Sequence, residues 1–248
     1  MNRHIDLMTW PEIRRHLDAG RDTIVAAFGA TEPHGPHLPL ATDTLLGNQL
    51  AARVADQLDA LVAPTIPIGC SSHHQAFAGT LSLTDSTFSA IVGDIVESFA
   101  RSGFHRAILR PSHGGNFAPL AAAVAVLPRY PGLHVDALSD LSVLTSLPVH
   151  GEREEDISVG EGGLHGGEWE TSLLLASDPD SVRMSQAEAG YVGPPHEALA
   201  AVFDHGVHAI SSNGVIGDPR SADRERGERY WAYIITTILD VLGGTASD

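Results

Sequence analysis

The 248-residue sequence contains no lysine, because all 15 basic residues are arginines. Schiff-base chemistry, attachment of pyridoxal phosphate and the phosphate-binding P-loop all require a lysine side chain, so the sequence excludes these enzyme classes. The arginines are outnumbered by 31 acidic residues, which gives a formal charge of −16. This charge argues against a nucleic acid or an anionic membrane surface as a partner.

Cysteine and long apolar runs are also scarce. The single cysteine, Cys70, can form neither a disulfide framework nor a four-cysteine zinc site, which fits a reducing compartment. No run approaches the ~20 apolar residues of a membrane span, and the first residues, MNRHID, lack the apolar core of a signal peptide. We therefore expect a cytoplasmic protein without a membrane partner. The length fits one α/β domain over residues 1–248.

Short apolar segments alternate with longer segments of helical periodicity. Strands are predicted at residues 23–28, 60–68, 106–110 and 133–138. Helices are predicted at residues 44–58, 86–102, 116–127 and 220–242. This alternation predicts an α/β fold with a mainly parallel central sheet that helices cover on both faces.

Polar clusters follow the predicted strands. They are GATEPHGPHLPLATD at residues 29–43, SSHH at 71–74, SHGGN at 112–116 and LHGGEWETS at 164–172. Ligands of parallel sheets bind beyond the carboxyl ends of the strands, so we expect these clusters to meet at one edge. The acidic, glycine-rich segment 151–163 precedes the last cluster, and it is either a mobile lid or a solvated loop without function.

These clusters supply three carboxylates and two imidazoles: Glu32, Asp43 and Glu170, with His34 and His113. Without compensation, the carboxylates would repel one another and be costly to bury. Divalent cations would remove both problems. A nitrogen and oxygen ligand set without thiolate suits Zn²⁺, Mn²⁺ or Fe²⁺, and one bridging aspartate would let two ions lie about 3.5–4 Å apart. The predicted chemistry is metal-assisted hydrolysis.

Each of these residues also has a simpler interpretation. Asp43 alone is typical of a helix N-cap, and His113 before two glycines can satisfy a turn. Their joint placement after successive strands favours the metal site. We interpret His37 as structural and Cys70 as a packed thiol, because no base lies near Cys70 in the sequence.

The same motifs resemble the creatininase (creatinine amidohydrolase) family in order and spacing. The resemblance rests on EPHGPHLPLATD (32–43), FAGTLS (77–82), HGGN (113–116), HGGEWETS (165–172) and GVIGDP (214–219), and it covers nearly the whole chain. It implies a three-layer α/β/α fold, hydrolysis of C–N bonds in amides with one or two divalent ions, Zn²⁺ first among them, and a homohexamer.

The resemblance also implies roles for individual residues. Glu32, His34, Asp43 and His113 correspond to metal ligands, with Asp43 as the bridge. Creatininase has a glutamate ligand two residues after this histidine, where this sequence has Gly115, so we choose Glu170 as the replacement, acting as ligand or catalytic group.

Further residues are assigned to catalysis and substrate binding. His165 corresponds to the histidine that moves protons beside the substrate. Ser71, His73, His74 and Trp169 are the predicted substrate-binding residues. Residues 141–164 contain no tryptophan, whereas creatininase closes over creatinine with tryptophans, so the sequence disfavours creatinine itself.

Three functions are consistent with these residues. The first is a metal-dependent amidohydrolase in which metal-bound hydroxide attacks the C–N bond of a small cyclic or linear amide. The second is a creatininase-like peptidase of the mycofactocin type, which trims a peptide precursor in cofactor maturation. The third is a metal-binding oligomer without catalysis, which His165 and Glu170 disfavour because a purely structural metal site needs no proton carrier.

Overall fold

The computed structural model describes residues 3–244, apart from the side chains of residues 142–144. Its strands are β1 (Thr23–Phe28), β2 (Leu61–Val62), β3 (Arg106–Pro111) and β4 (His134–Ala137). Its α-helices are α1 (Trp10–Asp18), α2 (Thr42–Leu58), α3 (Asp85–Ser102), α4 (Phe117–Ala125), α5 (Ser142–Glu155), α6 (Val159–Gly162), α7 (Glu168–Ser177), α8 (Pro195–His205) and α9 (Arg224–Gly244).

The four strands form one parallel sheet in the order β2-β1-β3-β4. Val25 pairs with Val62 on one side and Ile108 on the other, so β1 and β3 are central. Strand β1 is almost fully buried, which explains its continuous apolar sequence. The predicted parallel sheet is confirmed.

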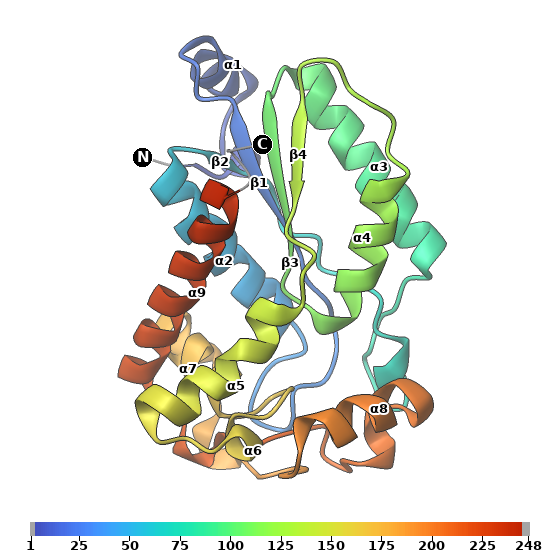
Figure 1. Ribbon diagram of the computed structural model, residues 1–248, viewed down its shortest axis with the longest axis vertical. Helices are drawn as coiled ribbons and strands as arrows, with labels where there is room; N and C mark the ends of the chain where they lie inside the picture. Colours follow the sequence, from blue (N-terminus) through green and yellow to red (C-terminus); the bar gives the residue numbers. More distant parts are fainter. Residues whose placement is uncertain (1–2, 245–248) are drawn as a thin grey trace.

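Helices cover both faces of this sheet and bury two separate hydrophobic cores (Figure 1). One core packs α2, α7 and α9 against Val25, Ala27 and Ile108. The other packs α3 and α4 against Ile24, Ala26 and other side chains that alternate with the first set along the strands. The three-layer α/β/α fold is therefore confirmed. Figure 1 shows α6, α7 and α8 grouped beyond the carboxyl ends of the strands.

Three expectations about local structure were wrong. The strand predicted over residues 60–68 is only Leu61–Val62, because Pro64 and Pro67 cannot donate ladder hydrogen bonds. Asp43 is not an N-cap: Ala41 occupies that position, and Asp43 lies within the first turn of α2. The segment 151–163 is not a loop, because it contains the end of α5 and all of α6.

Helix α6 starts with a capping box, in which Glu161 accepts hydrogen bonds from the backbone N–H and hydroxyl of Ser158.

Among residues 3–244, no helix combines the length and apolar character that crossing a bilayer requires.

Candidate metal centre

The structure brings together all five predicted metal ligands. Glu32 and His34 follow β1, His113 follows β3, and Asp43 and Glu170 lie in the first turns of α2 and α7. All five are buried. They meet beyond the carboxyl ends of the two central strands, where ligand sites of parallel sheets are expected.

His113 presents its Nδ1 atom to two carboxylates. This atom lies 3.2 Å from Glu32 Oε1 and 3.3 Å from Asp43 Oδ2. Its other ring nitrogen, Nε2, lies 3.2 Å from the carbonyl oxygen of Cys70 and 3.3 Å from the hydroxyl of Ser71. Donation from Nε2 to the carbonyl leaves the lone pair on Nδ1, as a metal ligand requires.

His34 is oriented in the same way with its nitrogens exchanged. Nδ1 lies 3.2 Å from the carbonyl oxygen of Glu32. Nε2 is therefore the nitrogen that would present a lone pair to an ion, and it lies 3.4 Å from Asp43 Oδ1 and 3.8 Å from Glu170 Oε1. Each imidazole is fixed by a backbone carbonyl and faces the carboxylates with its free nitrogen.

Asp43 is the residue that the two halves of the site share. One of its oxygens faces His34 and the other faces His113. Two groups of potential ligand atoms result, Glu32 with Asp43 and His113, and His34 with Asp43 and Glu170, each within a span of 4.8 Å. The hydroxyl of Ser112 donates to the backbone oxygen of Asp43 at 2.7 Å and so fixes the start of α2.

Glu170 has one carboxylate oxygen that could bind a metal ion. Its Oε2 accepts a hydrogen bond from the backbone N–H of Gly166 at 2.5 Å. Its Oε1 faces His34. The backbone bond fixes the side chain and leaves a single oxygen directed toward His34 and Asp43.

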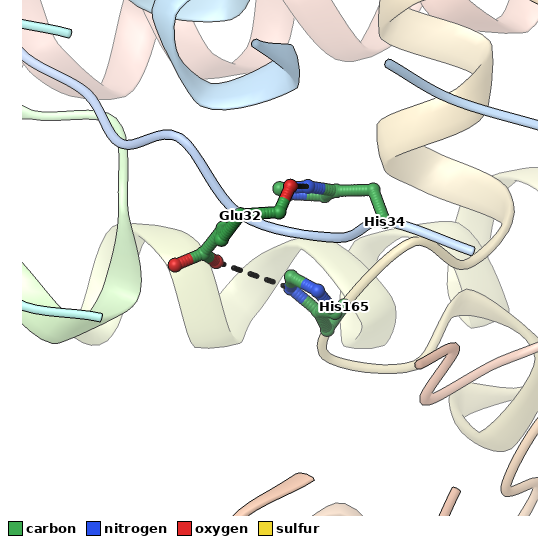
Figure 2. A group of neighbouring side chains, drawn as sticks. All are labelled: Glu32, His34 and His165. Carbon is green, nitrogen blue, oxygen red and sulfur yellow. Dashed lines mark hydrogen bonds and ion pairs between the residues drawn. The ribbon is translucent and has the colours of Figure 1, made fainter. Parts of the chain in front are cut away.

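His165 lies beside the segment that follows β1, and Figure 2 shows it facing Glu32. Its Nδ1 is 3.8 Å from Glu32 Oε1, and its ring centroid is 4.1 Å from that of His34. Its Nε2 lies 2.5 Å from the carbonyl oxygen of Pro33. With Nε2 donating to this carbonyl, Nδ1 is the nitrogen that can accept a proton. Glu32, His34 and His165 form a third group that could hold an ion.

The pKa values of the site depend on a balance between burial, which disfavours every charged group, and attraction between the imidazoles and the carboxylates. Burial lowers the pKa of His34, but the Asp43 and Glu170 carboxylates outweigh it and raise the value to about 9. Burial likewise opposes ionisation of Asp43, yet His34 and His113 hold its pKa well below the usual range. Burial is the larger influence on Glu170, whose pKa rises to about 7. Without metal, imidazolium charge balances the carboxylates.

Gly115 occupies the position at which the family resemblance places a glutamate ligand, and the atoms around it leave no room for a side chain. A Cβ atom at Gly115 would lie 2.3 Å from the carbonyl oxygen of Cys70 and 2.5 Å from the His113 ring. Any side chain here would displace His113. Glu170, which reaches the site from α7, does not meet this obstacle.

The four predicted substrate residues lie at different depths. His73 and Trp169 line the cavity above the ligands. His74 also lines it, and its Nε2 lies 3.2 Å from Glu32 Oε1, so His74 contacts a predicted metal ligand directly. Ser71 is buried behind His113.

Two further predictions agree with the structure: buried His37 contacts the Thr171 hydroxyl at 2.9 Å, and Cys70 is a buried free thiol.

One wall of the cavity was not foreseen. It is apolar and combines side chains of α8 with neighbours in three other segments: Leu164, Leu199, Val202, Phe203, Val207 and Ile216. We call these six residues the apolar wall. The amphipathic sequence of α8 resembles that of any surface helix, so no signal in the sequence connects it with the site.

Comparison with known proteins agrees with this geometry. The family model of creatinine amidohydrolase (creatininase) matches residues 6–242. A mycofactocin precursor peptide peptidase of Mycolicibacterium smegmatis is 33% identical, over 91% of this chain and 86% of that protein. A creatinine amidohydrolase of Pseudomonas putida is 29% identical, over 95% of this chain and 94% of that protein.

Solved structures show the same fold. A crystal structure of creatininase superposes with a TM-score of 0.81 at 27% identity, covering 100% of this chain and 99% of that one. A manganese form of creatininase has a TM-score of 0.82 at 25% identity, with full coverage of both chains. A creatininase variant described as Zn–Zn type is 26% identical with a TM-score of 0.79 and the same coverage. The chain belongs to the creatininase family and is, like its members, a metal-dependent amidohydrolase.

Proposed function

We propose that this amidohydrolase binds two divalent ions and cleaves an uncharged amide that carries an apolar group. Glu32, Asp43 and His113 would hold the first ion, and His34, Asp43 and Glu170 the second. The observation that carries the proposal is the placement of Asp43, whose two oxygens face different imidazoles.

The buried polar atoms fit such ions. Within the described residues, both carboxylate oxygens of Glu32, His34 Nε2 and Asp43 Oδ2 are buried without a hydrogen-bond partner. Buried polar atoms normally have a hydrogen-bond partner, so four without one in a single cluster favour a cation bound among them. The mixed nitrogen and oxygen donors suit Zn²⁺, and Mn²⁺ or Fe²⁺ are the alternatives.

The chain's own residues would divide the chemistry. Bound ions would supply Lewis acidity, which would lower the pKa of a water and stabilise negative charge on the amide oxygen. In the metal-free protein, burial, followed by the charge of His34, lowers the pKa of His165 to about 3. An ion that displaces the His34 proton would remove the second influence and raise the pKa of His165 toward the range that a general base needs. We assign His165 as the residue that accepts a proton at Nδ1 and delivers it to the leaving nitrogen. Glu32 and Glu170 act as ligands.

The apolar wall supports the choice of substrate. It lies in the same cavity as Glu32, Asp43 and His113, and no arginine among the described residues lines that cavity. A charged substituent would lose its hydration there without gaining a partner. An aliphatic or aromatic group next to the scissile bond would instead bury apolar surface.

A peptide is the second candidate substrate, and the relationship to mycofactocin precursor peptide peptidases favours it. Under this alternative, the same residues would trim a peptide precursor with an apolar residue against the wall. Cyclic amides, formamides and short peptides therefore need to be compared directly.

The test combines metal content with hydrolysis. We expect two ions per chain in the parent, and cleavage of apolar amides in preference to charged ones of equal size. Asp43→Ala should lose both ions and all activity. His37→Asn is the matched control, because His37 lies in the same segment but contacts Thr171 rather than the ligands. An Asp43→Ala protein with full metal content and activity would refute the proposal.

Assembly and location stay predictions. We propose a cytoplasmic homo-oligomer, a hexamer by family resemblance. Light scattering of the purified protein would test the hexamer, and cell fractionation would test the location.

A further inference from the structure

A second buried carboxylate, Glu168, lies two residues before Glu170 but belongs to a different environment. Glu168 is fully buried at the start of α7. Its Oε1 accepts hydrogen bonds from Arg226 Nη1 at 2.7 Å and from the Ser172 hydroxyl at 2.6 Å. Its Oε2 accepts one from the Tyr230 hydroxyl at 2.9 Å. Both oxygens are satisfied, in contrast to those of Glu32, so Glu168 does not call for an ion.

Such a buried charged cluster adds little net stability, because the desolvation cost of its charges offsets most of their attraction. It does fix geometry. Arg226 and Tyr230 both lie on α9, so the cluster attaches the first turn of α7 to α9. An α-helix turns by about 100° per residue, so the side chain two positions after Glu168 points about 200° away. Because Glu168 is held against α9, Glu170 must point away from α9. His34 and Asp43 lie on that opposite side of α7.

Other contacts keep α7 from rotating. The Ser172 hydroxyl accepts a hydrogen bond from the backbone N–H of Asp223 at 2.9 Å. The Trp231 indole donates to the carbonyl oxygen of Leu173 at 3.2 Å. Gly227 permits the close approach, because a Cβ atom there would lie 1.9 Å from the carbonyl oxygen of Ser172. The two helices are therefore locked in one register.

We propose that Glu168, together with Arg226 and Tyr230, is a positioning cluster that sets Glu170 for the second ion. This inference rests on the proposed two-ion site. The cluster touches neither the ion nor the substrate. Its effect is selective, because the first ion depends on Glu32, Asp43 and His113, none of which lies on α7.

The experiment measures the affinities of the two sites for Mn²⁺ separately, by calorimetric titration of metal-free protein and by metal analysis after dialysis. In Glu168→Gln and Tyr230→Phe, we expect the second ion to bind more weakly because Glu170 loses its fixed direction. The loss should be about 10-fold, the lower end of the range for removing a direct outer partner of a ligand, because this cluster acts through the helix. The first ion should bind within about threefold of the parent. Tyr230→Phe removes one oxygen atom only, so it keeps the test informative if Glu168→Gln does not fold.

Glu228→Gln is the control. Glu228 also lies on α9, but its carboxylate pairs with Arg53 at 3.1 Å and contacts no member of the cluster, so both ions should bind as in the parent. If Glu168→Gln and Tyr230→Phe both retain the parental affinity for two ions, the positioning role is refuted while the proposed function stands. If the parent binds only one ion, the two-ion site fails, and the inference fails with it.

Discussion

Gly115 offers a sharp test of the proposed site, because one added methyl group should disturb His113, a proposed metal ligand. In Gly115→Ala, the new Cβ would lie 2.3 Å from the carbonyl oxygen of Cys70, whereas real Cβ contacts essentially never fall below 3.0 Å. The backbone must therefore move by at least 3.0 − 2.3 = 0.7 Å. That carbonyl accepts the hydrogen bond from His113 Nε2, so the movement also misorients the imidazole.

The magnitude follows from the cost of overpacking. Adding a methyl group to a packed interior costs about 1–3 kcal/mol. For a protein of this size, each kcal/mol lowers Tm by about 2–4 °C, so we expect a fall of about 2–12 °C in the metal-free protein. Misorientation of His113 should also lower the affinity for the first ion by about tenfold.

Gly114→Ala provides the matched comparison. A Cβ atom at Gly114 would have no neighbour within 4 Å, although the residue is adjacent in the same short helix, Gly114–Asn116. Thermal unfolding and Mn²⁺ titration of both variants would separate steric conflict from any general effect of alanine. Identical Tm values and affinities for the two variants would refute the reasoning.

Three further predictions follow from the structure. The metal-free His34 imidazole has a pKa of about 9 and is protonated at pH 7, so an ion must displace its proton. Mn²⁺ binding should strengthen by up to about tenfold per pH unit from pH 7 to 9, and calorimetry in two buffers of different ionisation enthalpy would detect the released proton. In His165→Gln, kcat should fall about 10²- to 10⁴-fold with metal content unchanged, and an undiminished kcat would remove its assigned role. Gly227→Ala should unfold at a lower temperature than the parent because of the clash with Ser172, whereas Gly243→Ala, in the same helix with open space around it, should be neutral or slightly stabilised.

The sheet was predictable where a strand is wholly buried. The predicted strand at residues 23–28 coincides with β1, because a buried parallel strand is apolar throughout. Helix α5 was missed because Pro148 and Gly151 are poor helix formers, and its position depends on contacts with other helices. Tyr233, for example, donates to Ser146 at 3.1 Å.

The meeting of the proposed metal ligands at one site was predictable because three of the five belong to one short motif whose residue types suit only a few chemistries. Glu168 and Glu170 show the limit of that method. They are neighbouring carboxylates of the same motif, yet one faces α9 and the other faces the ligands. The choice depends on the rotation of α7, which is set by side chains more than 50 residues away.

The apolar wall bears on how proteins with this site can come to accept different substrates. Four of its six residues, Val202, Val207, Ile216 and Leu164, belong to or pack on a small hydrophobic cluster that is separate from both sheet cores. Leu164 and Ile216 adjoin His165, one along the chain and the other through backbone hydrogen bonds, whereas Val202 and Val207 come from segments that supply none of the proposed ligands. Under the proposed function, substitutions at Val202 and Val207 would change which group is accommodated and leave the carboxylates and imidazoles in place, as one expects of a scaffold that retains its chemistry while its substrates change.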